Sequence, residues 1–364
     1  MSQALVSLFH GPSTPMELAA VAIPTVEAGH ALVRVTLATI CGSDLHTVGG
    51  RRDAPTPCIL GHEGVGRVAE ANGLSAADGR PLVAGDRVTW SLMSTCGECP
   101  YCTERRLPQK CDHLSKYGHA RYEGAHDLNG CFAEYILLRP GTRVHHIPDV
   151  VTDEEAVPLN CAGATIVGGL GAVGTREGES AVVLGSGMLG LYAAARLRTL
   201  GYETVAVVDR LEPRLRLARE FGATDTFQVG DMDEDVIGEA LRELTQGRGP
   251  DLAVEVSGAP SALANAVDWL GVGGRCLTLG YVYPGSNVAF DAQKLVTKCL
   301  TLRGLHNYDP KALGAALEFV SATRERFPFG SLVGPTYVLP DIDAAFAHAA
   351  RGDAIRVGVA PGRP

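Results

Sequence analysis

The pattern of apolar and polar positions changes character about halfway along the chain. Between Ala31 and Pro148, short β-branched runs such as Arg87–Trp90 alternate with Gly and Pro, which predicts a loop-rich domain of many strands. From about Glu179 onward, apolar strands alternate with helical stretches, as in a parallel sheet with crossover helices. The chain is therefore predicted to be an α/β protein.

The second half of the chain resolves into individual elements. Strands are expected at Ala181–Leu184, Thr204–Val208, Thr224–Gln228, Leu252–Val256 and Arg275–Leu279. Helices are expected at Leu191–Leu200, Leu211–Phe221 and Met232–Thr245. After about Thr301 the chain has a mixed strand and helix texture, and we expect it to return to the first domain.

Length, composition and charge narrow the functional class. A chain of 364 residues exceeds what one hydrophobic core usually supports, which favours two domains. Its formal net charge of −9 would repel a phosphate backbone, so nucleic acid is not an expected partner. No long apolar stretch predicts a membrane span, and Met1–His10 has no signal-peptide pattern, so we expect a cytoplasmic protein without a membrane partner.

A glycine motif follows the strand that begins at Ala181. Gly185, Gly187 and Gly190 form a G-x-G-x-x-G pattern between that strand and a predicted helix, where backbone amides can bind a pyrophosphate. The next strand ends at Asp209, whose carboxylate can accept hydrogen bonds from ribose hydroxyls and repels a 2′-phosphate. This favours NAD over NADP.

Arginines next to that carboxylate leave NADP as the alternative cofactor. Arg210, Arg214 and Arg216 follow Asp209, and an arginine beside such an acid can accommodate a 2′-phosphate. We interpret these three residues as solvated helix charges.

Four of the ten cysteines lie close together in sequence. Cys96, Cys99, Cys102 and Cys111 follow the spacing C-x2-C-x2-C-x8-C in a turn-rich segment. Four thiolates at this spacing can close a tetrahedron around zinc with no open position, which defines a structural site.

Three further candidate ligands, Cys41, His62 and Cys161, are scattered along the chain. Two cysteines and one histidine are a known set for a catalytic zinc with one open position. Taken singly, each of them is equally compatible with an ordinary core residue.

Together these motifs identify a family resemblance over nearly the whole chain. The segments 41–46 (CGSDLH), 61–66 (GHEGVG), 85–88 (GDRV) and 161–165 (CAGAT), with the four-cysteine lobe and the glycine motif, occur in the order typical of zinc-containing medium-chain alcohol dehydrogenases. The resemblance implies a GroES-like β-rich catalytic domain, residues 1–160 and 301–364, that carries both zinc sites. It also implies a Rossmann domain of residues 161–300 and two zinc ions per chain.

The resemblance also implies roles for individual residues. Cys41, His62 and Cys161 would bind the catalytic zinc. Ser43 would take the proton of the alcohol, His46 would relay it towards solvent, and Glu63 would act near the metal without binding it directly. Thr165 would pack beside the nicotinamide and Arg356 would contact the pyrophosphate.

Members of the family are commonly dimers or tetramers that pair through the edge of the Rossmann sheet, here near Cys299–Gly304. Two features depart from the family pattern: the last cysteine gap is one residue longer, and extra residues lengthen a turn at Ser75–Pro81. Neither lies among the residues assigned to the chemistry.

The alcohol itself is open at this point. Segments around Arg51, Arg52, Lys116 and His119 resemble a branch associated with phosphonate metabolism, which implies a hydroxyalkyl phosphonate substrate held by these cationic groups. The alternatives are a polyol or amino-alcohol dehydrogenase, a zinc-free quinone reductase of the same superfamily, and a zinc-stabilised NAD-binding protein without activity.

Overall fold

A computed structural model describes residues 2–124 and 127–362. The chain divides into two compact units, of which the first comprises residues 1–164, 309–324 and 329–364 and the second residues 165–308 and 325–328. The expected domain boundaries, after residues 160 and 300, fall slightly before those of the units. Each unit is described by itself below.

The second unit is built on one parallel sheet with the strand order β12-β11-β10-β13-β14-β15. Its strands are β10 (Ser180–Leu184), β11 (Thr204–Asp209), β12 (Asp225–Gln228), β13 (Leu252–Glu255), β14 (Arg275–Thr278) and β15 (Thr301–Gly304). The five strands expected from the sequence match β10 to β14 to within one residue at each end. The edge strand β15 is largely exposed.

Helices connect these parallel strands. They are α5 (Met188–Thr199), α6 (Glu212–Glu220), α7 (Glu234–Leu244), α8 (Pro260–Trp269) and α9 (Ala292–Thr297), whereas α4 (Ala162–Val173) begins in the first unit and precedes β10. The central strands β10, β11 and β13 are almost entirely buried, because helical crossovers cover the faces of a parallel sheet. Their apolar runs are therefore continuous rather than alternating.

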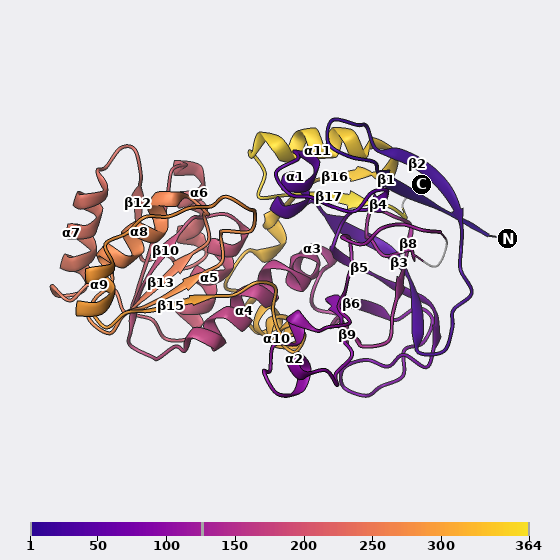
Figure 1. Ribbon diagram of the computed structural model, residues 1–364, viewed down its shortest axis with the longest axis horizontal. Helices are drawn as coiled ribbons and strands as arrows, with labels where there is room; N and C mark the ends of the chain where they lie inside the picture. The colour runs from indigo at the N-terminus through magenta and orange to yellow at the C-terminus, as the bar shows by residue number, and fades with distance from the viewer. Residues whose placement is uncertain (1, 125–126, 363–364) are drawn as a thin grey trace. The chain divides into compact units, whose positions relative to one another are not determined.

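The first unit consists of antiparallel and mixed sheets, the larger of which runs β16-β17-β3-β5-β6-β7 with β8 and β9 paired to β3 and β6. Its strands are β1 (Gln3–Phe9), β2 (Glu17–Ala22), β3 (His30–Thr39), β4 (Cys58–Ile59), β5 (Glu63–Asn72), β6 (Arg87–Ser94), β7 (Ser115–Lys116), β8 (Tyr135–Leu138), β9 (Thr142–His146), β16 (Val333–Val338) and β17 (Arg356–Ala360). β17 pairs with β3, which brings the last strand of the chain into the same sheet as β3 and β5 from its first quarter (Figure 1).

The helices of this unit are short except near the C-terminus. They are α1 (Gly42–Val48), α2 (Pro100–Thr103), α3 (Asp153–Ala156), α10 (Ala312–Thr323) and α11 (Ile342–Arg351), with the 3₁₀ turns η1 (Pro108–Lys110), η3 (Val157–Asn160), η4 (Phe329–Leu332) and η5 (Leu339–Asp341). Among the described residues, no single helix meets the length and apolarity of a membrane span. One bent pair, Asp153–Asn160 with Ala162–Val173, meets both by length and composition alone.

Candidate metal centres and dinucleotide site

The four cysteines of the lobe converge around α2 and η1. The Sγ atom of Cys99 lies 3.6 Å from that of Cys102 and 3.8 Å from that of Cys111. The Sγ atoms of Cys111 and Cys96 are 3.4 Å apart, and none of these cysteines forms a disulfide. A tetrahedron of sulfurs at the usual zinc distance has an edge of about 3.8 Å. The lobe therefore has the size and donor chemistry of a closed zinc site.

Backbone amides support the sulfurs of this lobe. The amide of Cys99 donates to Cys96 Sγ, the amide of Cys96 to Cys111 Sγ, and the amide of Asp112 to Cys99 Sγ. The bond from Asp112 is the main cause that lowers the pKa of Cys99 to about 6, although burial opposes it. Burial is the main cause that raises the pKa of Cys102 to about 12 and also raises that of Cys111, so Cys99 is the thiolate that the loop favours before a metal binds.

A second group of donors forms near the start of α1. The ligand atoms of Cys41, His62, Glu63 and Cys161 all lie within 4.8 Å of one another. Cys41 is the N-cap of α1, His62 immediately precedes β5, and Cys161 follows η3. Three separate segments of the first unit thus deliver two sulfurs and an imidazole to one point, a donor set that fits zinc.

Asp44 orients two of these donors. It is 1% exposed, and its Oδ2 accepts a hydrogen bond of 2.9 Å from the backbone amide of Cys41, which closes a capping box at the start of α1. Its Oδ1 lies 3.4 Å from Nδ1 of His62. Burial lowers the pKa of His62, but Asp44 and, after it, Cys41 together outweigh that effect and raise it to about 10. The carboxylate therefore directs Nε2 of His62 towards the cysteines.

Of the two cysteines of this group, Cys41 is the one that ionises more easily. A hydrogen bond with Cys161 is the largest effect that lowers the pKa of Cys41, against burial, and the charge of Arg356 adds to it. The same hydrogen bond, and after it burial, raise the pKa of Cys161. Nη2 of Arg356 lies 3.6 Å from Cys41 Sγ. Because a bound cation favours deprotonated ligands, metal binding at this site would release protons.

The carboxylate of Glu63 already has an arginine and a threonine as hydrogen-bond partners. Its carboxylate is fully buried and pairs with Arg356, at 3.0 Å from Nε to Oε2 and 3.3 Å from Nη2 to Oε1. The hydroxyl of Thr39 donates to Oε2 as well. Arg356, expected at the pyrophosphate, is engaged here with Glu63, and its Nη1 donates to the carbonyl of Ile355.

The two proposed proton carriers lie on α1. Oγ of Ser43 is 3.4 Å from Nε2 of His62, so its hydroxyl borders the donor cluster. His46 follows on the next turn of the helix, where burial and then the charge of Arg51 lower its pKa. His46 is therefore mostly neutral near pH 7 and able to accept a proton.

Lys116 and His119, both expected to be cationic, lie near the same cluster. The expectation is wrong for His119, because burial, and after it the charge of Lys116, lower its pKa well below the usual value for histidine. The ring centroid of His119 is 5.0 Å from that of His62, and its Nδ1 contacts the carbonyl of Tyr117 at 2.8 Å. Burial, and after it the charge of Arg52, lower the pKa of Lys116 to about 8, with Cys161 among the opposing charges.

The glycine motif has the geometry of a nucleotide-binding turn. Gly185 has φ +106°, and a Cβ there would lie 3.0 Å from the amide nitrogen of Ser257. A Cβ on Gly190 would lie 1.9 Å from the carbonyl oxygen of Gly185, so only glycine lets α5 approach the turn. Gly187 is the N-cap of α5, and the space beside its Cα is open. A phosphate can therefore reach the first amides of the helix.

Asp209 lies at the end of β11, beside this turn. Its Oδ2 accepts a hydrogen bond of 2.6 Å from the amide of Ser186, and its Oδ1 accepts one of 2.9 Å from the amide of Leu211. Asp209, Arg210 and Arg214 line one cavity of about 520 Å³, whereas Arg216 does not line it. Thr165, assigned to the nicotinamide, lies half-buried in α4.

Sequence reasoning missed several members of these sites. Asp44 carries a local signal, because an acid three residues after the helix cap is the spacing of a capping box. The contact between Glu63 and Arg356 has no such signal, since the two residues are 293 positions apart. Glu234 and Asn265, which line the cavity, were not singled out.

Comparisons with known proteins match most of the chain. Residues 27–149 match the model of the alcohol dehydrogenase GroES-like domain, and residues 189–322 that of the zinc-binding dehydrogenases. The chain is 30% identical to the 5-exo-hydroxycamphor dehydrogenase of Pseudomonas putida over 90% of this chain and 91% of that one. It is 32% identical to an L-threonine 3-dehydrogenase of Shewanella sp. (strain ANA-3) over 78% and 79%. An alcohol dehydrogenase structure from Thermotoga maritima superposes with a TM-score of 0.94 at 29% identity, covering 99% of this chain and 100% of that chain.

Proposed function

The chain belongs to the zinc-containing medium-chain alcohol dehydrogenase family, and we propose that it transfers a hydride from an alcohol to NAD, which yields the carbonyl compound, or catalyses the reverse reaction. The observation that carries the proposal is the convergence of Cys41, His62 and Cys161 on one point. When bound there, zinc supplies a Lewis acid that makes an alcohol hydroxyl more acidic, and NAD accepts the hydride. The four-cysteine lobe would hold a second, structural zinc.

Residues of α1 would manage the proton. The hydroxyl of Ser43 borders the donor cluster and is placed to receive the proton of the alcohol. His46, one turn further on, is kept mostly neutral by burial and by Arg51 and can take that proton towards solvent. Catalysis would accordingly require the neutral form of His46 in the direction of alcohol oxidation.

Buried partners would hold the donors in place. Asp44 fixes the ring of His62, and the pair of Glu63 with Arg356 places a positive charge next to Cys41. That charge favours the thiolate form of Cys41, which is the form that binds a metal.

NAD would bind across the glycine turn of the second unit. The amides at the start of α5 would bind the pyrophosphate, and Asp209 would accept hydrogen bonds from the adenosine ribose. A 2′-phosphate would meet the Asp209 carboxylate, which supports NAD rather than NADP. Arg210 and Arg214 line the same cavity and make this preference the point to measure first.

For the substrate, we propose an alcohol that carries an anionic group, such as a hydroxyalkyl phosphonate. Lys116 is largely buried, its charge interacts with those of Cys41, Cys161 and Asp44, and Arg52 lies near enough to lower its pKa. The cationic groups of Lys116 and Arg52, near the donor cluster, favour a substrate that carries an anionic group. An amino alcohol remains the alternative, in view of the similarity to an L-threonine 3-dehydrogenase.

The experiment measures the turnover of a panel of alcohols of matched chain length by the absorbance of NADH, and repeats each measurement with NADP. We expect turnover with NAD, and a higher kcat/KM for the phosphonate alcohol than for the neutral one. Equal or better rates with the neutral alcohol would discard the anionic substrate, and a high rate with a polyol or amino alcohol would replace it.

Metal content and one variant separate an enzyme from a protein that only binds NAD. We expect about two zinc ions per chain. Cys41→Ser should abolish turnover with little change in NAD binding. A wild-type chain with one zinc and no turnover would support the binding-only alternative, and joint loss of folding and NAD binding in the variant would show that Cys41 has a different role.

A further inference from the structure

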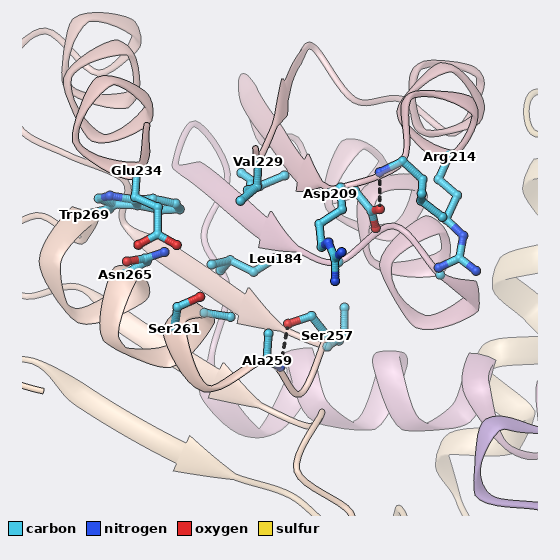
Figure 2. A pocket seen from close by; sticks show the side chains of 17 residues that line it. Leu184, Asp209, Arg214, Val229, Glu234, Ser257, Ala259, Ser261, Asn265 and Trp269 are labelled. Atoms are coloured by element: carbon cyan, nitrogen blue, oxygen red, sulfur yellow. Dashed lines mark hydrogen bonds between the residues drawn. The ribbon is translucent and has the colours of Figure 1, made fainter. Parts of the chain in front are cut away.

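The cavity of the second unit has two polar ends (Figure 2). Asp209 lies at one end, beside the glycine turn, and Glu234 and Asn265 lie at the other. Leu184 and Val229 lie between them and give the middle of the cavity an apolar lining. At about 520 Å³ the cavity falls in the usual range for a small-molecule site.

The end wall is assembled from two helices. Glu234 is the first residue of α7, and Asn265 lies on α8, one turn before Trp269. The indole of Trp269 is 4% exposed and packs against α7 at Gly238, where a Cβ would lie 2.8 Å from the ring. Glycine at this position therefore lets the two helices close behind the cavity, and the indole backs the polar pair.

The polar side chains of Glu234 and Asn265 line the cavity without a partner in the described residues. Both are half-buried, and neither side chain has a hydrogen bond or ion pair within residues 2–124 and 127–362. Figure 2 shows the carboxylate and the amide at the same end of the cavity. A ligand that covered this wall and left the carboxylate and the amide without hydrogen bonds would cost desolvation energy, so the pair is suited to a ligand edge that carries a donor and an acceptor.

Resting on the dinucleotide site proposed above, we propose that Glu234 and Asn265 recognise the amino edge of the adenine ring. The ribose hydroxyls would lie at Asp209, and the planar base would extend over Leu184 and Val229 towards the end wall. The 6-amino group of adenine donates hydrogen bonds and its N1 accepts one. A carboxylate accepts only, and a carboxamide can donate, so the two side chains complement that edge.

The pairing makes a prediction about a close relative of the base. Hypoxanthine carries a carbonyl oxygen where adenine has its amino group, and a proton on N1. Its carbonyl would face the carboxylate of Glu234, which has no proton to offer, and the amide of Asn265 would have to turn over. Sites built around such a hydrogen bond reject the analogue strongly, here by roughly tenfold to a hundredfold in affinity.

The test measures binding to the full-length, zinc-loaded protein. Dissociation constants of NADH and of reduced nicotinamide hypoxanthine dinucleotide are measured by titration calorimetry and by quenching of tryptophan fluorescence, to which Trp269 contributes. We expect the wild type to bind NADH at least roughly tenfold more tightly. E234Q should reduce the ratio to within about threefold, because a glutamine amide can donate to the carbonyl of hypoxanthine.

Two further variants complete the design. E239Q makes the same charge change on the exposed face of α7 and should keep the wild-type ratio. N265D replaces the donor that faces N1 of adenine by an acceptor and should shift the preference towards hypoxanthine, which tests the proposal even if E234Q folds poorly.

The outcomes separate this inference from the proposed function. Equal binding of the two dinucleotides by the wild type, or an unchanged ratio in both E234Q and N265D, would overturn the role of the end wall while leaving NAD binding in place. Failure of the wild type to bind either dinucleotide would overturn the proposed function and this inference with it.

Discussion

Asp44 offers a sharp test of the proposed catalytic metal site, because it contacts the site without belonging to the donor set. Asp44→Asn keeps the size of the side chain and one carbonyl oxygen, which can still accept the hydrogen bond from the amide of Cys41. It removes the negative charge that lies 3.4 Å from Nδ1 of His62. The ring of His62 would then be both less basic and less firmly oriented.

The magnitude follows from that contact. Loss of a carboxylate that supports a metal-binding histidine typically weakens metal affinity about 10- to 100-fold. Asp44→Ala should weaken it further, because the capping box at Cys41 is lost as well, at a cost of about 0.3–1.5 kcal/mol of stability. The lobe of Cys96, Cys99, Cys102 and Cys111 contributes no ligand to this site and should keep its affinity.

The assay withdraws zinc with a chelator whose zinc complex absorbs visible light. Wild-type protein should release two populations of zinc, and in Asp44→Asn one of them should leave at a chelator concentration about 10- to 100-fold lower. Asp149→Asn, which makes the same change at an exposed position, is the matched control. Identical release curves for wild type and Asp44→Asn, or an equal shift of both populations, would refute the assigned role.

Two further predictions concern other buried titratable groups of the first unit. Arg356→Met should lower the free energy of unfolding in urea by about 3–5 kcal/mol, because it leaves Glu63 buried without its partner, and adding Glu63→Gln should recover part of the loss; an additive double variant would contradict this. Burial and then the charge of Arg143 lower the pKa of His145 to about 4, so stability should fall as the pH falls from 6.5 towards 4, when the unfolded chain binds a proton that the folded chain does not. His145→Leu should remove about 1–2 kcal/mol of the stability difference between pH 7 and pH 5, measured by urea denaturation, and an unchanged pH dependence would count against it.

The elements of the parallel sheet could be predicted closely because their signals are local. Ala181–Leu184 is apolar throughout and Leu252–Val256 is apolar except for Glu255, and such short runs bounded by glycine or polar residues have few other interpretations. The spacing of the cysteine lobe likewise lies within one short segment. In both cases the residues that act together are neighbours in the sequence.

The second donor cluster could not be derived in this way. Cys41, His62 and Cys161 meet only because β3, β5 and η3 pack together, and each residue alone is as common in an ordinary core. A family resemblance connected the three, but it did not indicate that Arg356 pairs with Glu63. Long-range contacts between single charged residues leave no periodic trace in a sequence.

The hydrogen bonds of Asp209 have a consequence for the evolution of cofactor preference. This carboxylate ties the glycine turn, through the amide of Ser186, to the first residue before α6, through the amide of Leu211. Replacing it by a small neutral residue would remove the repulsion of a 2′-phosphate and at the same moment cut the brace between two loops. A descendant that changes its coenzyme would therefore first need other contacts that hold these two loops together. A single substitution of Asp209 should give a protein whose glycine turn is less rigid and which binds either coenzyme weakly.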